Sequence, residues 1–102
     1  MPRTLATLAC MLVFSWAMPA PALVDCSKPR STVDRLICTS DRLAVADQIM
    51  AATFREAYYR TRDKEALIKE QERWRKDVRD ACNDVPCLME AYQRRTLELQ
   101  TY

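Results

Sequence analysis

The chain has 102 residues, 49% of them hydrophobic and 29% charged, with 16 lysine and arginine residues against 14 aspartate and glutamate residues. A charge balance this even gives no basis for binding nucleic acid or a strongly acidic ligand. The chain contains no histidine and no glycine. It therefore lacks the usual general base, the commonest neutral metal ligand and the glycine-rich loop that holds phosphates. Long helices joined by short polar corners are expected instead.

Residues 1–22 predict an export signal. Arg3 gives a positive start, an apolar run without charges follows, and Ala20-Pro21-Ala22 supplies the small residues of a cleavage site. We place the cleavage after Ala22. An uncleaved membrane anchor is the less favoured alternative, because the run is shorter than the ~20 residues that a spanning helix needs. Neither Cys10 nor Cys26 has the sequence context of a lipoprotein.

The expected mature protein is residues 23–102, a single small domain with a net charge of +1. It has no second long apolar segment, so we predict no membrane span in the mature form. The export signal predicts a periplasmic or secreted location.

Two helices are predicted in the first half of this domain. Ser31, with Asp34 three residues later, predicts the start of a short helix over residues 32–38. Apolar residues then recur every three or four positions, which predicts a long helix over residues 41–62. The apolar positions are Leu43, Ala46, Met50, Phe54, Ala57 and Tyr58.

Two more helices are predicted in the second half. Asp63 is expected to cap a helix over residues 64–82, and Asp84 to cap a last helix with Pro86 in its first turn. No segment alternates as a strand would. We therefore predict an all-α fold, a small up-down bundle of three main helices with a short N-terminal capping helix. The predicted buried positions are Leu67, Gln71, Trp74, Val78 and Ala81 on one helix, and Leu88, Ala91, Tyr92, Arg95 and Leu99 on the other.

Four cysteines remain after the signal: Cys26, Cys38, Cys82 and Cys87. An even number in a small exported domain favours disulfide bonds. The eleven residues between Cys26 and Cys38 are a poor spacing for a zinc site, and the four between Cys82 and Cys87 are a poor spacing for a redox pair. Three pairings are possible. We favour Cys26 with Cys38 and Cys82 with Cys87, because each pair brackets one reversal of the chain.

Motifs in residues 36–58 and 70–99 follow one another in an order that resembles the lysozyme inhibitor LprI N-terminal domain family. The resemblance covers about residues 26–99 and implies a helical, disulfide-bonded domain of the periplasm or cell envelope, with lysozyme as a candidate partner. The residues that carry it are Ile37, Cys38, Leu43, Asp47, Gln71, Trp74, Arg79, Cys82, Cys87, Leu88, Ala91, Tyr92 and Arg95.

Several of these residues are expected to support the fold rather than to bind. Helical spacing predicts that Trp74 and Tyr92 fill the core, whereas Tyr59 is the better candidate for the surface. Asp47 is expected to pair with Arg79 or Arg95 inside the bundle and to fix the register of the helices.

No catalytic site is predicted, and neither a cofactor nor a metal. Nothing in the spacing of the candidate carboxylates indicates a shared pocket, and no histidine is present to activate a serine. An acidic face would suit a basic lysozyme, but lysine and arginine interrupt it and favour an ordinary solvated helix face. The catalytic candidates were Glu70, Glu72, Asp77 and Asp80, and the acidic face would comprise Glu65, Glu70, Glu72 and Asp77.

The leading hypothesis is an exported module that binds a protein, with lysozyme-type hydrolases as the partner that the resemblance implies. The alternative is a structural or interaction domain of the cell envelope that does not inhibit lysozyme. A small-molecule binder is the third class, and it would need a cavity inside the bundle.

Overall fold

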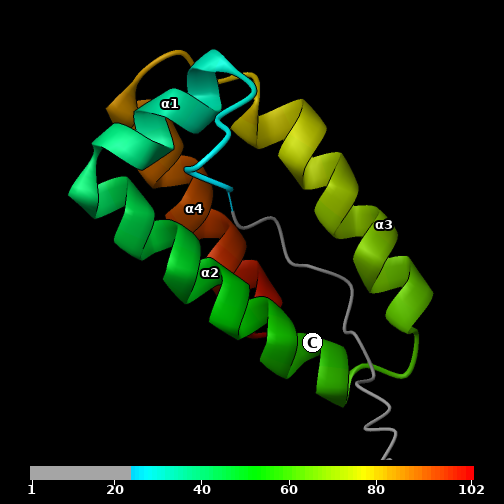
Figure 1. Ribbon diagram of the computed structural model, residues 1–102. Coiled ribbons are helices and arrows are strands. Elements are labelled where there is room, and N and C mark those ends of the chain that lie inside the picture. The colour runs from blue at the N-terminus through cyan, green and yellow to red at the C-terminus, as the bar shows by residue number, and fades with distance from the viewer. Residues whose placement is uncertain (1–23) are drawn as a thin grey trace, which may run out of the picture.

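The computed structural model describes residues 24–102 (Figure 1). The predicted export signal lies outside the described residues, so its cleavage stays a prediction. The described chain is helical and contains no strand, which confirms the predicted all-α fold. Its elements are α1 (Thr32–Thr39), α2 (Asp41–Arg60), α3 (Lys64–Trp74), the π-helix η1 (Arg75–Arg79) and α4 (Val85–Leu99).

Each α-helix begins at a polar side chain that caps it. The side-chain oxygens of Ser31, Ser40, Asp63 and Asp84 each accept a hydrogen bond from the backbone N–H three residues later, at 2.9 to 3.3 Å. These bonds satisfy amide groups that a helix leaves unpaired at its start. Helix α2 ends two residues earlier than predicted, because Thr61 already has extended backbone.

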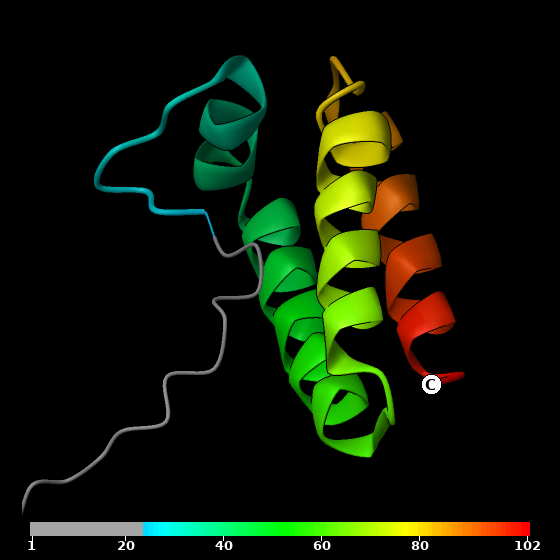
Figure 2. The same ribbon diagram turned by 90° about the vertical axis from the view of Figure 1, so that its right-hand side faces the viewer.

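The three long helices alternate in direction, so that α2 and α4 run the same way and α3 runs against them (Figure 1). Figure 2 shows α3 lying in front of the pair formed by α2 and α4. Helix α1 lies across the end of the bundle where α2 and α4 begin. Helix α1 is therefore the short N-terminal capping helix that was predicted.

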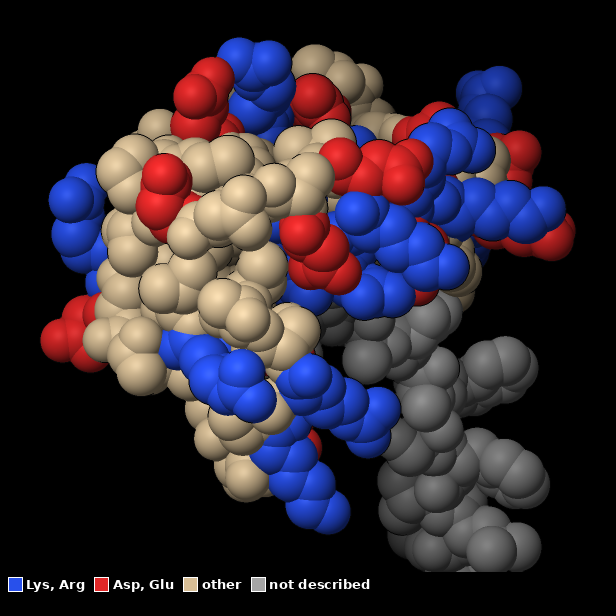
Figure 3. All heavy atoms as spheres, turned by 90° about the horizontal axis from the view of Figure 1, so that it is seen from above, with Lys and Arg blue, Asp and Glu red and all other residues tan. Residues whose placement is uncertain are grey.

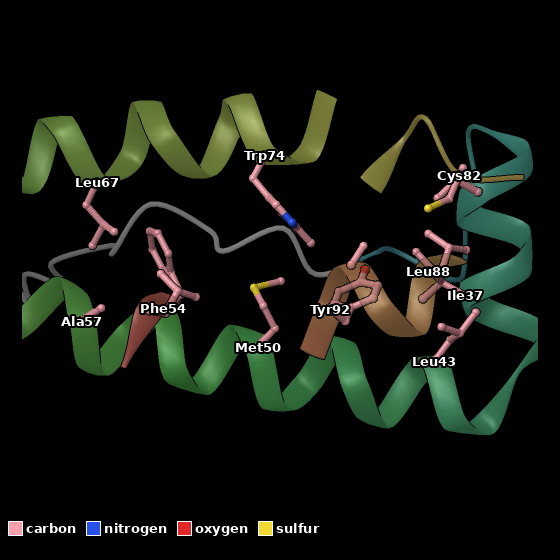
Figure 4. Close-up of a cluster of buried hydrophobic side chains, with 13 residues drawn as sticks. Ile37, Leu43, Met50, Phe54, Ala57, Leu67, Trp74, Cys82, Leu88 and Tyr92 are labelled. Atoms are coloured by element: carbon pink, nitrogen blue, oxygen red, sulfur yellow. The ribbon is translucent and has the colours of Figure 1, made fainter. Parts of the chain in front are cut away.

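The core runs lengthwise between the long helices (Figure 4). In its middle, Trp74 of α3 and Tyr92 of α4 meet edge to face, with ring centroids 5.4 Å apart and Met50 of α2 beside them. Leu67 and Phe54 fill the part of the core near the corner between α2 and α3. Burial of such side chains stabilises the fold by about 1.5 to 3 kcal/mol each.

The predicted third helix differs from the observed one in its last turns. The N–H of Asp80 donates to the carbonyl of Arg75, five residues back, at 3.0 Å. This wider turn holds one residue more than an α-helical turn and so rotates the following side chains. Arg79 becomes buried, whereas Val78 is 45% exposed. The prediction that Val78 and Ala81 face the core is therefore wrong, and Arg79 and Cys82 take those positions.

Candidate functional site

Both disulfides have the favoured pairing, and each has a Cα–Cα distance of 5.5 Å. The bond between Cys26 and Cys38 joins the segment that precedes α1 to the last turn of α1. The bond between Cys82 and Cys87 closes the corner between η1 and α4. The corner therefore has a structural function, and its cysteines are not free thiols.

Asp47 of α2 is buried against Tyr92 of α4. The Tyr92 hydroxyl donates to Asp47 Oδ1 at 2.9 Å, and the N–H of Val24 donates to Oδ2 at 3.4 Å. Burial raises the pKa of Asp47, although these two hydrogen bonds and the charge of Arg79 oppose the rise. Burial and the Asp47 carboxylate also raise the pKa of Tyr92 well above its usual value.

The expected ion pair between Asp47 and an arginine is not formed within residues 24–102. Arg79 instead contacts Asp34 Oδ1 through Nη2 at 3.5 Å and Asp80 Oδ1 through Nε at 2.9 Å. The π-helix rotates the side chains at the end of this segment, and Arg79 there contacts Asp34 of α1. Only 4% of Arg79 is exposed, so this contact is a buried link between η1 and α1.

Arg95 of α4 belongs to a second set of buried polar contacts. Its Nε donates to Gln71 Oε1 at 2.8 Å, and Gln71 Nε2 lies 3.1 Å from Met50 Sδ. Arg95 Nη1 contacts Glu98 at 3.2 Å, while Nη2 is buried and has no hydrogen-bond partner among the described residues. The contacts of Met50, Gln71 and Arg95 join α2, α3 and α4. They fit the structural use that the sequence predicts for Arg95.

Hollows flank α4 on both sides. The first, which we name the polar hollow, lies between α4 and the α3–η1 segment. Its volume is about 530 Å³. One edge of the buried Trp74 ring borders it, and the exposed Arg94 stands at its rim, 2.8 Å from Glu90. Its lining residues are Glu70, Arg73, Trp74, Asp77, Val78, Ala91, Arg94, Arg95 and Glu98.

The second hollow, which we name the apolar groove, lies between α2 and α4 and has a volume of about 450 Å³. Val45, Ile49 and Leu97 are 53%, 53% and 64% exposed there. This groove was not predicted from the sequence. Val45 and Ile49 stand four residues apart beside the buried stripe of α2, and this spacing was the signal that could have revealed it. Its lining residues are Arg42, Val45, Ala46, Ile49, Met89, Gln93, Thr96 and Leu97.

On the face that Figure 3 shows, lysine and arginine are interspersed with aspartate and glutamate. Within α3, Glu65 lies 3.5 Å from Lys69. Glu72 pairs with Arg75, which lowers the pKa of the Glu72 carboxyl through a hydrogen bond and through the positive charge. Neighbouring positive charges therefore partly neutralise Glu65 and Glu72.

The other candidate residues are brought together only in part. Glu70 and Asp77 border the polar hollow. Asp80, the residue after η1, instead forms an ion pair with Arg79. Tyr59 is 73% exposed, at the far end of α2. In residues 24–102, no three histidine, cysteine, aspartate or glutamate side chains are grouped as a metal site would require.

The same part of the chain holds no helix that combines the length and the apolar character required to cross a bilayer.

Comparison with known sequences identifies the family. The sequence model described as "Lysozyme inhibitor LprI" matches residues 26–99. The chain belongs to the lysozyme inhibitor LprI family. The LprI match includes both disulfides, the polar hollow and the apolar groove, and it confirms the resemblance noted from the motifs.

Relatives within the LprI family include the proteins named "Lipoprotein LprI" of Mycobacterium bovis and Mycobacterium tuberculosis. Each is 32% identical over 80 residues, which cover 74% of this chain and 40% of the relative. The chain thus corresponds to about two fifths of the length of these relatives. No solved structure matches the chain significantly.

Proposed function

We propose that this LprI-family chain is an exported protein-binding module that inhibits a lysozyme-type hydrolase. The observation that carries the proposal is the family match over residues 26–99, which takes in every described helix. The relatives are longer than this chain, so the proposal concerns the helical domain alone. It acts by binding, and it needs no metal or cofactor.

The two disulfides support the proposed export. Disulfides persist in oxidising compartments such as the periplasm and the cell exterior, and they are rare in the cytosol. Small exported domains use them because a small core alone gives limited stability. A periplasmic or secreted location would also place the domain beside enzymes that attack the cell wall.

The polar hollow is the surface that we propose for the hydrolase. Lysozyme-type enzymes carry two carboxyl groups beside the scissile glycosidic bond, commonly about 5 Å apart in retaining enzymes. A guanidinium group matches a carboxylate in charge and in hydrogen-bond geometry. Arg73 and Arg94 stand on two different helices that flank the hollow. They would meet the enzyme's carboxyl groups as the two domains dock.

The test is lysis of bacterial cell walls by an animal-type lysozyme in the presence of oxidised residues 23–102. We expect lysis to slow when the domain reaches a molar amount similar to that of the enzyme. The double variant Arg73→Glu/Arg94→Glu should raise the concentration needed for half inhibition at least about tenfold, because each substitution replaces an attraction by a repulsion.

A matched control distinguishes the local effect of the two substitutions at the hollow from the effect of the changed net charge. Arg55→Glu/Arg62→Glu changes the charge by the same amount at two exposed positions outside both hollows, and it should inhibit like the wild type. An equal loss in both double variants would assign the effect to overall charge. Absence of inhibition at a large molar excess of wild type would refute the proposal and favour an envelope interaction domain.

A further inference from the structure

The apolar groove offers a surface that the proposed hydrolase contact does not use. Its lining residues come only from α2 and α4, and Arg42 is the single charged one. Three large apolar side chains on it are more than half exposed. Clustered exposed apolar side chains of this kind mark contact surfaces between proteins.

Charged residues stand at the two ends of the same face of α2. Arg42, Ile49 and Glu56 are spaced by seven residues, which is almost two helical turns, and so they lie along one line of the helix. Arg42 and Glu56 are about 21 Å apart along the axis, at a rise of about 1.5 Å per residue. Ile49 is the midpoint between Arg42 and Glu56.

We propose that the apolar groove binds the same groove of a second copy of this chain, in a two-fold symmetric dimer whose axis passes beside Ile49. The two α2 helices run antiparallel in this dimer. Val45 and Ile49 of one copy then enter the groove of the other, and each Arg42 faces Glu56 of the other copy. A two-fold contact of this kind uses one patch twice, so the two charge pairs form together.

Charge complementarity favours antiparallel α2 helices over parallel ones. Parallel α2 helices would bring Arg42 against Arg42 and Glu56 against Glu56, which repel. Within residues 24–102 Arg42 forms no ion pair, and Glu56 has a loose contact with Arg60 at 3.9 Å. Both side chains are exposed and are therefore accessible to a partner.

The size of the face predicts a weak dimer. A strip about 21 Å long over two helices, each about 10 Å across, has a projected area of roughly 400 Å² per copy. Stable interfaces bury about 800 Å² per partner. We therefore expect a reversible equilibrium that shifts with protein concentration, and this inference does not depend on lysozyme inhibition.

Analytical ultracentrifugation of the oxidised protein over a range of concentrations tests the proposal. The wild type should show a sedimentation coefficient that rises from monomer to dimer. Ile49→Asp should remain monomeric throughout, because it places two carboxylates at the centre of the contact. Arg55→Glu, outside the groove, should dimerise like the wild type, and far-UV circular dichroism verifies that each variant is folded.

A charge exchange tests the antiparallel geometry. Arg42→Glu and Glu56→Arg should each weaken self-association about tenfold, since each turns two attractive pairs into two repulsive ones. An equimolar mixture of the two variants should form a heterodimer about as well as the wild type forms its dimer, because every facing pair is again of opposite sign.

A wild type that stays monomeric up to millimolar concentration would overturn the dimer, and so would a mixture that associates no better than its components. If the wild type is monomeric and Ile49→Asp loses lysozyme inhibition, the groove belongs to the hydrolase instead. The charge exchange decides the question even if Ile49→Asp does not fold.

Discussion

The two ends of the helical bundle are stabilised in different ways. At the end where α1 lies, which we call the disulfide end, two covalent bonds and a buried ion pair act together. Arg79 connects η1 to α1 there through Asp34, and both side chains are largely withdrawn from solvent. Three separate segments are thus fixed to one another around buried apolar side chains such as Ile37, Leu43 and Leu88.

The opposite end, which we call the open end, also buries apolar side chains such as Phe54 and Leu67, but its polar contacts are exposed. Arg60 donates from Nε to the carbonyl of Tyr102 at 3.1 Å and from Nη2 to the carbonyl of Leu99 at 3.4 Å. Lys64 lies 5.0 Å from the ring centre of Tyr58. Such contacts compete with water and contribute little.

Covalent bonds and the buried Arg79–Asp34 pair are thus gathered at the disulfide end. Substitutions at the disulfide end should therefore change the free energy of unfolding much more than substitutions at the open end. Each experiment below either removes this contrast or measures it more finely.

Arg79→Ala should have the largest effect. It leaves Asp34 without its buried partner and opens space beneath α1, so we expect a loss of about 3 to 5 kcal/mol in the free energy of unfolding. Urea denaturation followed by circular dichroism measures it. A double-mutant cycle with Asp34→Asn should give a coupling of at least about 0.5 kcal/mol. A loss below about 1 kcal/mol for Arg79→Ala would contradict a structural role for this arginine.

The two disulfides should rank by the length of the loop that each closes. In the loop-entropy model, Cys26→Ala/Cys38→Ala costs about 3 kcal/mol and Cys82→Ala/Cys87→Ala about 2 kcal/mol. Thermal unfolding of both variants beside the wild type measures this order. Peptide mapping without reductant gives an independent control, and a link from Cys26 to Cys82 or to Cys87 would refute the pairing.

Asp47→Asn should show its effect as a dependence on pH. The pKa of Asp47 is raised above its ordinary value of 3.8, so the folded state holds this proton more tightly than the unfolded state. The wild type should gain stability relative to the variant as the pH falls through the raised pKa toward that value. The gain is about 1.4 kcal/mol for each unit of difference in pKa.

Urea titrations of both proteins at neutral pH and at about pH 4 measure this gain. A difference between wild type and variant that stays constant with pH, or that moves in favour of the variant on acidification, would contradict the buried ionisable carboxyl.

Arg60→Ala should have the smallest effect, below about 1 kcal/mol, because its contacts at the open end are exposed to water. Arg55→Ala on the same helix serves as a control for loss of an exposed arginine. Thermal denaturation at low and high salt measures both. A loss as large as that of Arg79→Ala would remove the contrast between the two ends.

The sequence predicted the helices well because their signals are local. Caps such as Ser31 and Asp84 lie within a few residues of the groups that they satisfy, and the apolar stripe of α2 repeats along one helix. The π-helix could not be predicted in this way. The α-helical period assigns Val78 to the core, and only contacts with α1 show why Arg79 is buried instead.

The sequence indicated that polar side chains would be buried, but it did not indicate which residues they would contact. Asp47 was expected to pair inside the bundle with either Arg79 or Arg95, and all three side chains are buried. Asp47 nevertheless contacts Tyr92, because the partner of a side chain depends on the rotation of the neighbouring helix. The two hollows were harder to foresee, since each combines residues from helices that only folding brings together.

In the proposed mode of action, the polar hollow binds a lysozyme-type hydrolase. Isothermal titration calorimetry of the oxidised domain against an animal-type lysozyme tests it most directly. We predict a complex of one domain with one enzyme for the wild type and for Arg55→Glu/Arg62→Glu, and an affinity at least about tenfold lower for Arg73→Glu/Arg94→Glu. No measurable binding by the wild type, or equal affinity for all three proteins, would contradict the claim.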